Sequence, residues 1–547
     1  MKPVWTLEQV TDNLARWNAA WPVGTIDYSY YIFPPGHHQQ PVVGFSAFSP
    51  AQRTALERIF DLVSDITPLD FREVASNGQE PGEGNERIGF LNVNSSNYFF
   101  TGRTRVDFPE SDGDALSPIR GADIEINMHR AGPRGGWAIG DSNFNTLNHE
   151  VLHSLGLLHP GDYNGDSGHA KDYETLAEYM QDSNQYTVMS YWAAAETGAD
   201  HVGGGRVRFS ATPLLHDIAT LQALYGANMT TRTGNTTYGF NSNAGRASFD
   251  LDRDPYLIFA IWDAGGTDTL DLSGFTGSSR IDLAEGAFSS GGDMTDRFAI
   301  AHGAVIENAV GGSGADTLLG NAAANRLDGG GGGDRMVGGF GDDVYIVDHS
   351  GDRAVENPGG DSGADLVKAS VDLTLGARLD NLLLTGAAAI DGTGNALANR
   401  ITGNNAANAL SGDRGGDLID ARGGGDLVAG GAGNDRLRGG GGEDVFLFDA
   451  ALSRTSNVDG LLDFSVAQDT IRLDRDIFTG FGRDGRIGAG EFALGARAGG
   501  SNDRILYDRD TGRLFYDADG DGAAAAILFA KVTPGTNLTA ADFEAYI

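Results

Sequence analysis

The apolar and polar positions of this chain follow short, varied periods before Gly311 and one long period after it. In the first part, apolar residues alternate with polar ones in some stretches and recur at helical spacing in others. The predicted elements are a short helix within residues 1–20 that contains Trp5, Leu14 and Trp17, strands at residues 25–32 and 122–127, and helices at residues 50–60, with Ser49 as N-cap, and 213–226. This part of the chain should therefore fold from both helices and strands.

From Gly311 the apolar positions recur every nine residues within the pattern G-G-x-G-x-D-x-U-x, in which U is apolar. Residues 311–319 fit this pattern, residues 329–346 repeat it twice, and a second block runs from Gly394 to Leu447. Such a period is typical of a solenoid, in which each repeat supplies a glycine-rich turn and a short strand. Two repeats should make one turn of a parallel β-roll, so residues 18 positions apart should stack. The apolar positions of the second block hold Ile401, Leu410, Ile419, Val428, Leu437 and Phe446.

The aspartates of the repeats stand in phase with the apolar positions. They are Asp316, Asp334, Asp343, Asp417, Asp426, Asp435 and Asp444. Carboxylates and turn carbonyls are the oxygen ligands that calcium prefers, and calcium would convert the repulsion between stacked carboxylates into cross-links. The expected stacked pairs are Asp316 with Asp334, Asp417 with Asp435, and Asp426 with Asp444, whereas Asp343 faces Asn325. A flexible glycine-rich linker, the alternative, would not keep aspartates and apolar residues in phase.

The repeat is imperfect. Asn325, Asn399 and Asn408 replace the aspartate in three repeats, and these turns should bind calcium weakly or not at all. Residues 347–393 lose the period, which predicts a non-repeat insertion between the two blocks. Residues 517–522 resemble the start of an EF-hand calcium loop, but Leu528 stands where that loop needs glutamate, so a turn is expected there.

Composition narrows the class of protein. With 547 residues the chain should form more than one domain, and a net charge of −36 argues against nucleic-acid binding, because phosphates would be repelled. No apolar run is long enough for a membrane helix, and the first residues lack the pattern of a cleaved signal peptide. There is no cysteine, so we expect calcium, in place of disulfides, to hold the roll together.

The strongest chemical signal is the motif H-E-x-x-H-x-x-G-x-x-H, which begins at His149. On a helix, His149 and His153 lie one turn apart and project from one face toward one metal ion. Glu150 is too close to them to be a comfortable ligand but can reach a water beside the metal. Gly156 should end the helix, because glycine readily adopts the left-handed conformation, and His159 then arrives as a third ligand. Three protein ligands and one open position are typical of a catalytic zinc.

A second landmark follows at residues 186–191, which read Y-T-V-M-S-Y. After the long zinc motif, this stretch resembles the Met-turn of the metzincin metalloproteases, a tight turn in which Met189 packs beneath the metal. Residues 159–163 (H-P-G-D-Y) and 188–192 (V-M-S-Y-W) narrow the resemblance to the serralysins, which are secreted bacterial zinc endopeptidases. The resemblance implies that Tyr191 can bind the zinc and swing away to stabilise the transition state.

The nine-residue motif is similar to that of the repeats-in-toxin (RTX) proteins, and serralysins carry such repeats after the protease. The resemblance implies an α+β metzincin protease domain, then an all-β parallel β-roll that binds calcium, then a C-terminal β-rich secretion region. The corresponding limits are residues 1–20 for a removable propeptide or an N-terminal docking helix, 21–245 for the zinc protease, 246–450 for the β-roll with its insertion at 347–393, and 451–547 for the C-terminal region. Residues 122–127 would line the substrate cleft.

The joint between protease and roll resembles two calcium sites of the serralysins. The residues that match the first site are Arg232, Gly234 and Thr236 through backbone oxygens, Asp263 and Asp268 through carboxylates, and Gly265 beside them; those that match the next are Glu307, Gly312, Gly314 and Asp316. His216, in the last helix of the protease, is expected to be structural because the zinc site is already filled.

These signals together predict a secreted zinc-dependent endopeptidase with Glu150 as general base, one catalytic zinc and several structural calcium ions. The expected partners are protein or peptide substrates, a small proteinaceous inhibitor, and a type I secretion machinery that reads an uncleaved C-terminal signal. A monomer is expected, without stable membrane insertion. The alternative is a calcium-dependent structural or adhesive RTX exoprotein with a vestigial protease domain, against which the intact histidines, Glu150 and Tyr191 argue.

Overall fold

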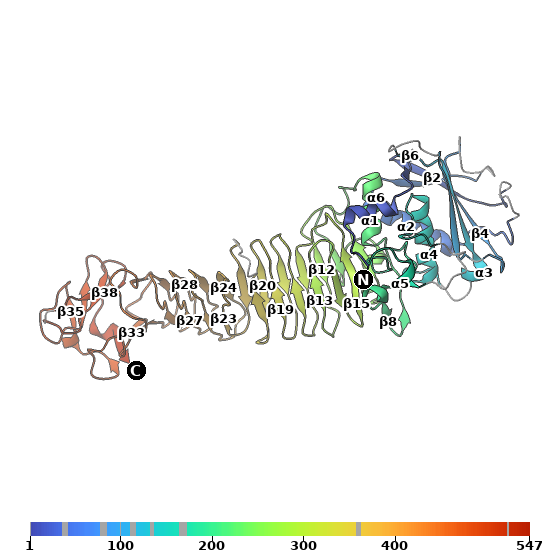
Figure 1. Cartoon of the computed structure of the whole chain (residues 1–547). Helices are drawn as coiled ribbons and strands as arrows, with labels where there is room; N and C mark the ends of the chain where they lie inside the picture. The colour runs from blue at the N-terminus through green and yellow to red at the C-terminus, as the bar shows by residue number, and fades with distance from the viewer. Residues whose placement is uncertain are drawn as a thin grey trace. The chain divides into compact units, whose positions relative to one another are not determined.

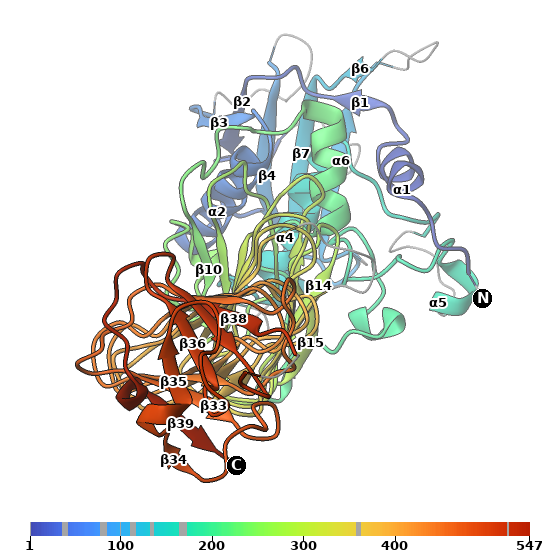
Figure 2. The same ribbon diagram turned by 90° about the vertical axis from the view of Figure 1, so that its left-hand side faces the viewer.

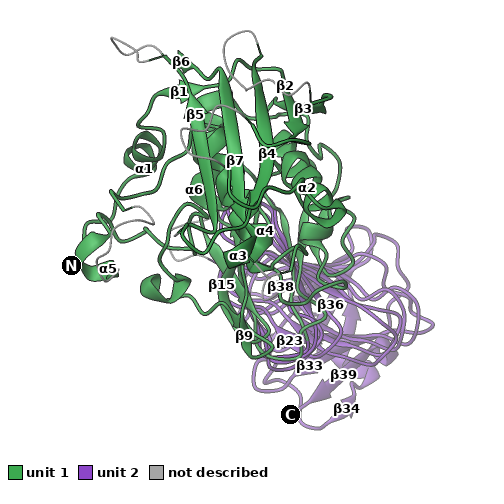
Figure 3. Ribbon diagram, turned by 90° about the vertical axis from the view of Figure 1, so that its right-hand side faces the viewer, with its two compact units in different colours: residues 1–312 green, residues 313–547 purple. Residues whose placement is uncertain are grey.

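A computed structural model describes residues 2–35, 42–76, 85–98, 100–109, 116–131, 136–163, 172–356, 363–521 and 524–547. The chain divides into two compact units, residues 1–312 and 313–547 (Figure 3). This boundary lies inside the range expected for the β-roll, so roll strands are found in both units, and the domain limits drawn from the sequence stay a prediction. Among the described residues, no helix combines the length and the apolar character needed to cross a membrane.

The first unit contains a five-stranded sheet with the strand order β3-β2-β4-β7-β5. Its strands are β2 (Thr25–Tyr30), β3 (Asp70–Glu73), β4 (Arg87–Val93), β5 (Gly102–Asp107) and β7 (Gly121–Asn127). All pairings are parallel except that of β5 with β7. Every residue of β4 and β7 is buried, as expected for the inner strands of a mainly parallel sheet.

Strand β7 does not lie where the strand that lines the substrate cleft was expected, at the edge of the sheet. Residues 122–127 do lie in a strand, but both sides of β7 are already hydrogen-bonded, one to β4 and the other to β5. The strands β3 and β5 form the two edges of the sheet, and β5 is antiparallel and pairs only with β7 among the described strands. Strand β5 could not be predicted from the sequence, because its residues G-R-T-R-V-D include a single apolar side chain.

Helices lie beside this sheet in the first unit (Figure 3). They are α1 (Leu7–Leu14), α2 (Pro50–Ile66), α3 (Met128–Ala131), α4 (Ser142–Ser154), α5 (Tyr173–Leu176) and α6 (Leu215–Tyr225). Ser49 caps α2 as predicted: its hydroxyl accepts the N–H of Gln52, and the Gln52 side chain accepts the N–H of Ser49. Helix α4 packs on β5 and β7, and α2 packs on α4, which brings the helix of the zinc motif against the edge strand.

The N-terminal helix is shorter than expected and is docked. It begins after the cap residue Thr6 and buries Val10 and Leu14, so Trp5 and Trp17 lie outside it. The Trp5 ring stacks on Tyr179 with the ring centroids 4.2 Å apart. Helix α1 packs on α6 (Figure 2). The choice between a docking helix and a removable propeptide stays a prediction.

Residues 227–312 complete the first unit with short strands. These are β10 (Thr237–Gly239), β11 (Phe259–Ile261), β12 (Thr269–Asp271), β13 (Arg280–Asp282), β14 (Phe288–Gly291), β15 (Met294–Ile300) and β16 (Asn308–Val310). The strands β10, β12 and β16 form a parallel ladder in which Tyr238, Leu270 and Ala309 stack in register and are fully buried. This part of the first unit is therefore built like a roll.

The second unit is the predicted parallel β-roll (Figure 1). Its roll strands are β17 (Thr317–Leu319), β18 (Arg326–Asp328), β19 (Arg335–Val337), β20 (Val344–Val347), β21 (Arg353–Val355), β22 (Leu366–Ala369), β23 (Leu373–Thr374), β24 (Asn381–Leu384), β25 (Gly392–Thr393), β26 (Arg400–Thr402), β27 (Ala409–Ser411), β28 (Leu418–Asp420), β29 (Leu427–Ala429), β30 (Arg436–Arg438) and β31 (Val445–Phe448). Ile401, Ile419 and Leu437 stack on one wall. Leu410, Val428 and Phe446 stack on the other, so the predicted spacing of 18 residues is confirmed.

The expected insertion at residues 347–393 does not interrupt the roll. Tyr345, Val367, Leu382 and Ile401 are consecutive register partners in parallel strands, although they lie 22, 15 and 19 positions apart in the chain. All four side chains are buried. The turns of this stretch vary in length while its strands keep stacking, so the nine-residue period is lost but the ladder is not.

The chain ends in a β-rich region, as predicted. Its strands are β32 (Asp459–Leu461), β33 (Thr470–Asp474), β34 (Gly485–Arg486), β35 (Phe492–Leu494), β36 (Ile505–Asp508), β37 (Arg513–Tyr516), β38 (Ile527–Lys531) and β39 (Phe543–Tyr546). Asp517 closes the expected turn, because its Oδ1 accepts the N–H groups of Asp519 and Gly520. Gly522, the last residue of the loop that resembles an EF-hand, lies outside the described residues.

Candidate metal centres

Three histidine side chains converge at the end of helix α4. The Nε2 atom of His159 lies 3.1 Å from Nε2 of His149 and 3.1 Å from Nε2 of His153. Ligands at a typical zinc–nitrogen distance in a tetrahedral site are about 3.3 Å apart, so the three nitrogens suit one zinc ion. They form one of two groups of possible metal ligands found among the described residues.

In His149 and His153, the ring nitrogen that points away from the three Nε2 atoms donates a hydrogen bond to a backbone carbonyl. Nδ1 of His149 lies 2.7 Å from the carbonyl oxygen of Val188, and Nδ1 of His153 lies 2.7 Å from that of Leu157. A carbonyl only accepts, so Nδ1 carries the proton and Nε2 keeps its lone pair for a metal. Burial lowers the pKa of His149 to about 4 and that of His153 well below its usual value, which keeps both rings neutral.

Gly156 lets the chain turn so that His159 can reach the other two histidines. Its φ is +96°, in the left-handed region, and a Cβ on it would lie 2.3 Å from the carbonyl oxygen of Ala19. The N–H of Leu157 bonds back to the carbonyl of Leu152 and closes the helix end. Both the backbone conformation and the close approach of Ala19 therefore require glycine, as the motif predicted.

Glu150 lies on the same helix, buried against strand β5. Its carboxylate accepts a hydrogen bond from the Thr104 hydroxyl at 2.7 Å. Burial raises the pKa of Glu150 to about 8, although the Thr104 hydrogen bond and the charge of Arg103 oppose this shift. A carboxyl group with such a pKa can take up a proton near neutral pH and give it back.

The predicted Met-turn lies behind the histidines and is fixed by a buried carboxylate. Asp217, on α6, accepts the hydroxyl of Thr187 at 2.5 Å and the N–H of Val188 at 2.9 Å. The N–H of Met189 in turn bonds to the Thr187 hydroxyl, and Met189 is fully buried. The Val188 carbonyl accepts the hydrogen bond of His149, and the Val188 N–H is bound by Asp217 of α6. Asp217 therefore helps to orient the His149 ring indirectly.

Tyr191 follows this turn and lies beside the histidines. Its ring centroid is 4.5 Å from that of His159 and 5.8 Å from that of His149. Both chain neighbours of Tyr191 are held by one buried carboxylate: Asp182 accepts the Ser190 hydroxyl at 2.7 Å and the Trp192 indole N–H at 3.1 Å. No sequence pattern pointed to Asp182 or Asp217, because neither belongs to a motif.

In the first unit, Thr236 and Asp268, expected for the first calcium site, come together with Glu307, which is expected for the second. Oδ1 of Asp268 accepts the N–H of Thr236, and Glu307 accepts the N–H of Asp268, each at 2.7 Å. The other oxygen of Asp268 is buried without a hydrogen-bond partner, and burial, with the charges of Asp263 and Glu307, raises the Asp268 pKa to about 7. A buried carboxylate oxygen without a donor suits a bound cation.

The remaining residues of that expected pair of sites are distributed over both units. A Cβ on Gly266 would lie 2.6 Å from the carbonyl oxygen of Gly234, so the loops that contain Gly234 and Gly265 approach closely. Arg232 has a φ of +49°, and its guanidinium binds Asp65 at 2.7 Å. Gly312 ends the first unit, whereas Gly314 and Asp316 belong to the second.

The aspartates of the roll form the predicted ladder. Asp435 accepts the N–H of Asp417 at 2.8 Å, Asp444 accepts that of Asp426 at 2.9 Å, and Asp334 accepts that of Asp316 at 2.8 Å, in each case through Oδ1. The Oδ2 atoms without a hydrogen-bond partner, all buried, include those of Asp334, Asp417, Asp426, Asp435 and Asp444. Burial and, to a smaller degree, the charge of the next aspartate raise the pKa of Asp417 to about 7 and that of Asp426 to about 6. This donor set suits calcium.

The rows of stacked aspartates extend beyond the residues that were predicted from the sequence. Asp334 and Asp343 donate their N–H groups to Asp352 and Asp365, and Asp435 and Asp444 donate theirs to Asp459 and Asp469. The prediction that only one pair is complete in the first block was therefore wrong. Asp352 keeps the spacing of 18 residues from Asp334 but lies in a stretch without the glycines of the motif. Asp365, Asp459 and Asp469 lie 22, 24 and 25 positions from their partners, since the turns that carry them are longer. As predicted, Asp343 does face Asn325, whose N–H it accepts at 2.7 Å.

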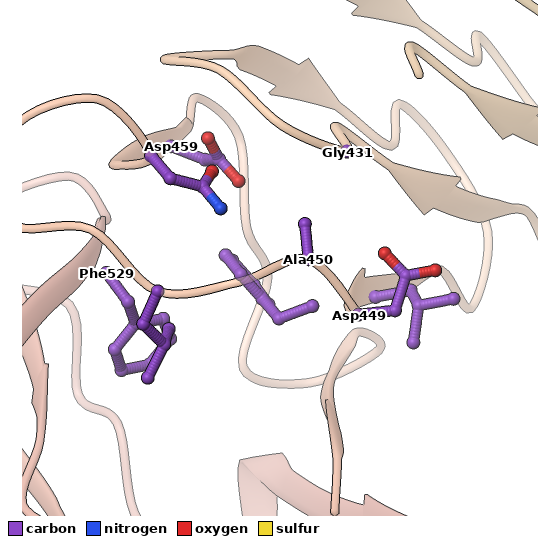
Figure 4. A pocket seen from close by; sticks show the side chains of 9 residues that line it. Gly431, Asp449, Ala450, Asp459 and Phe529 are labelled. Atoms are coloured by element: carbon purple, nitrogen blue, oxygen red, sulfur yellow. The ribbon is translucent and has the colours of Figure 1, made fainter. Parts of the chain in front are cut away.

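A small pocket lies near the end of the roll, away from the histidines in the sequence (Figure 4). Gly431, Ala450 and Phe529 line it together with two carboxylates, Asp449 and Asp459. Burial raises the pKa of both, in Asp459 to about 8. The described residues of this pocket do not include a group of three possible metal ligands.

Comparisons with known proteins agree with this description. Residues 227–481 match the family described as the C-terminal domain of the serralysin peptidases of group M10. The metalloprotease AprA of Pseudomonas entomophila (strain L48) is 36% identical over 326 residues, which are 58% of this chain and 64% of that protein. Serralysin B of Dickeya chrysanthemi is 36% identical over 336 residues (58% and 65%), and Serralysin C of the same species is 50% identical over 175 residues (32% and 35%). The chain thus spans just under two thirds of the first two relatives.

Proposed function

We propose that this chain is a secreted zinc-dependent endopeptidase of the serralysin type, in agreement with its match to the serralysin C-terminal family over residues 227–481 and with its similarity to metalloprotease relatives. The observation that carries the proposal is the convergence of three histidine Nε2 atoms, 3.1 Å from His159 to each of the others, on the helix that also presents Glu150. Three neutral imidazoles leave one coordination position open for reaction.

His149, His153 and His159 would hold the zinc, with Tyr191 beside them. The ion would supply a Lewis acid for the scissile carbonyl and acidify a water molecule. Glu150 takes the proton of the attacking water and later passes it to the leaving amine, which its raised pKa allows. The Tyr191 hydroxyl donates a hydrogen bond to the developing oxyanion.

The peptide substrate would bind as an extra strand on the edge of the sheet. The described strand β5 has one partner, β7, so its other side can pair with an extended peptide. The support for this proposal is that α4 packs directly on β5, which places Glu150 next to that edge. In this proposal, residues 102–107 line the substrate cleft, in place of residues 122–127.

Calcium would fold the roll after export. The buried, unpartnered carboxylate oxygens of the ladder support several structural calcium ions. At the low calcium concentration inside a cell the ladder would stay unfolded, as a type I secretion machinery requires, and calcium outside would fold it. The C-terminal signal, the inhibitor and the monomeric state expected from the sequence are part of this proposal.

A structural or adhesive protein with a vestigial protease domain is the less favoured function, because the ligands, the base and their supports are all present. Casein hydrolysis with and without a zinc chelator separates the two functions. An endopeptidase should lose its activity in the chelator and regain it when zinc is added. A protein that hydrolyses no casein, although it contains zinc, would contradict the proposal.

A further inference from the structure

Strand β5 presents two different faces to its surroundings. Side chains alternate along a strand, so Gly102 and Thr104 point to one side and Arg103 and Arg105 to the other. The two arginines pair with Glu125 of β7, at 2.6 Å for Arg103 and 3.4 Å for Arg105. The face that contains Gly102 and Thr104 lies against helix α4.

On that face, Thr104 contacts Glu150 at two points. Its Oγ1 lies 2.7 Å from a carboxylate oxygen of Glu150 and 2.9 Å from the backbone carbonyl oxygen of the same residue. The single hydroxyl hydrogen of Thr104 can be donated to either oxygen or shared between them, and the carboxylate oxygen is the nearer of the two. A buried carboxylate that is held in this way keeps one orientation, whereas a free glutamate side chain rotates about three bonds.

Gly102 provides the space that this orientation needs. A Cβ on Gly102 would lie 2.5 Å from Oε1 and 2.6 Å from Cγ of Glu150. The backbone of Gly102 does not require glycine, because its φ lies outside the left-handed region. Contact with Glu150 is thus the reason why a side chain is excluded there.

We propose that Thr104, together with the space left by Gly102, is a positioning residue that fixes the Glu150 carboxylate, so that the strand that binds the substrate also holds the general base. This inference rests on the proposed function. The strand that binds the peptide then also holds the carboxylate of the base, although the backbone of Glu150 belongs to α4.

A threonine hydroxyl suits this task chemically. The hydroxyl donates a hydrogen bond to the Glu150 carboxylate at 2.7 Å. Valine has the same shape without the hydroxyl and cannot make this contact.

The test compares four variants with the wild-type protein, all loaded with zinc and calcium. Thr104→Val removes the hydroxyl, Thr104→Ser restores it, and Gly102→Ala displaces the Glu150 side chain. The matched control is Thr25→Val, the same change on an exposed residue of β2 in the same sheet. The measurements are zinc content, kcat and KM for a peptide substrate, and a crystal structure of the Thr104→Val protein.

We expect Thr104→Val and Gly102→Ala to lower kcat about 10–100-fold with zinc content and KM unchanged, as for other groups that orient a catalytic side chain. Thr104→Ser should recover most of the rate, and Thr25→Val should equal the wild type. A kcat of Thr104→Val within twofold of wild type, or equal losses in the serine and valine variants, would overturn the inference.

The crystal structure separates this inference from the proposed function. If the wild-type protein hydrolyses no peptide, the proposed function fails, but the Glu150 carboxylate should still move in Thr104→Val relative to wild type. An unmoved carboxylate in that variant would overturn the positioning role, whether or not the wild-type protein is active.

Discussion

At the scale of single residues, the orientation of His149 is fixed by hydrogen-bonding groups that are not themselves expected metal ligands. The carbonyl of Val188 accepts Nδ1–H of His149, and Asp217 holds the N–H of Val188. Tyr191 is placed differently: its neighbours are fixed by Asp182, while its own ring lies beside His159. A histidine with such a support should hold its position at the metal, while a movement of Tyr191 during the reaction stays a prediction.

The first prediction separates a zinc ligand from an auxiliary group. His159→Ala should lose most of its zinc, because it removes one of three protein ligands. Tyr191→Phe should keep its zinc and lose mainly kcat, since only the hydroxyl is removed. Elemental analysis and peptidase rates on the two proteins check this prediction. An equal fall of metal content in both would show that Tyr191 is an obligatory ligand.

Sequence reasoning located the histidines, Glu150 and Tyr191 because short spacing on a helix and in a turn determines their neighbours. It could not locate Thr104, which lies 46 positions from Glu150, or Asp217, which lies 29 positions from Val188. Such pairs form only when the sheet and helices have packed, and single threonines and aspartates are common on any surface.

At the scale of elements, strands that recur at a constant spacing in the sequence could be predicted. Strands separated by turns of varying length could not. The strand stacking from β26 to β31 follows directly from the nine-residue period. The strands between residues 347 and 393 keep the same stacking with turns of other lengths, which hides them from any fixed spacing. Strand β5 was missed for another reason: an edge strand with charged side chains has no apolar alternation.

A second prediction concerns the ladder. Asp435 accepts one N–H and donates its own to Asp459, and its Oδ2 has no donor. Asp435→Asn should therefore weaken calcium-induced folding, because an amide replaces a charged calcium ligand at the middle of a row. Asp420→Asn, a change of the same kind on strand β28 outside the ladder, is the control.

Circular dichroism during calcium titration measures both variants. The wild-type protein and the control should gain β structure cooperatively, with a Hill slope above one, since each ion orders a turn that its neighbour shares. The Asp435→Asn protein should need more calcium to reach its midpoint. Identical midpoints for the two variants would mean that Asp435 binds no calcium.

At the scale of the whole molecule, the net charge of −36 makes the compact chain repel itself, and without cysteine no disulfide can oppose this repulsion. In the ladder, burial raises the pKa of Asp417 to about 7 and that of Asp426 to about 6. Bound protons or cations should therefore stabilise the folded roll.

The third prediction follows from the sign of these shifts. An unfolded aspartate has a pKa of about 3.9, so between about pH 4 and 7 the calcium-free folded roll binds more protons than the unfolded chain. The free energy of unfolding of the calcium-free roll should therefore fall as the pH rises through this window.

Thermal unfolding of protein dialysed free of calcium tests this, since chelators themselves lose affinity in acid. Without calcium, the roll should have more β structure and a higher unfolding midpoint at pH 5 than at pH 7.5, where its charged ladder should already be largely unfolded. With excess calcium the order should reverse, because protons compete with calcium for the carboxylates. A midpoint that does not change with pH in calcium-free buffer would rule out proton uptake by the ladder.

The central claim is that Glu150 is the general base beside a zinc ion held by three histidines. The most direct measurement is the peptidase rate of Glu150→Gln at a measured zinc content. Because glutamine keeps the shape of the side chain but accepts no proton, the account predicts stoichiometric zinc and a turnover several orders of magnitude below wild type. A variant that binds stoichiometric zinc and retains more than about a tenth of the wild-type rate would contradict it.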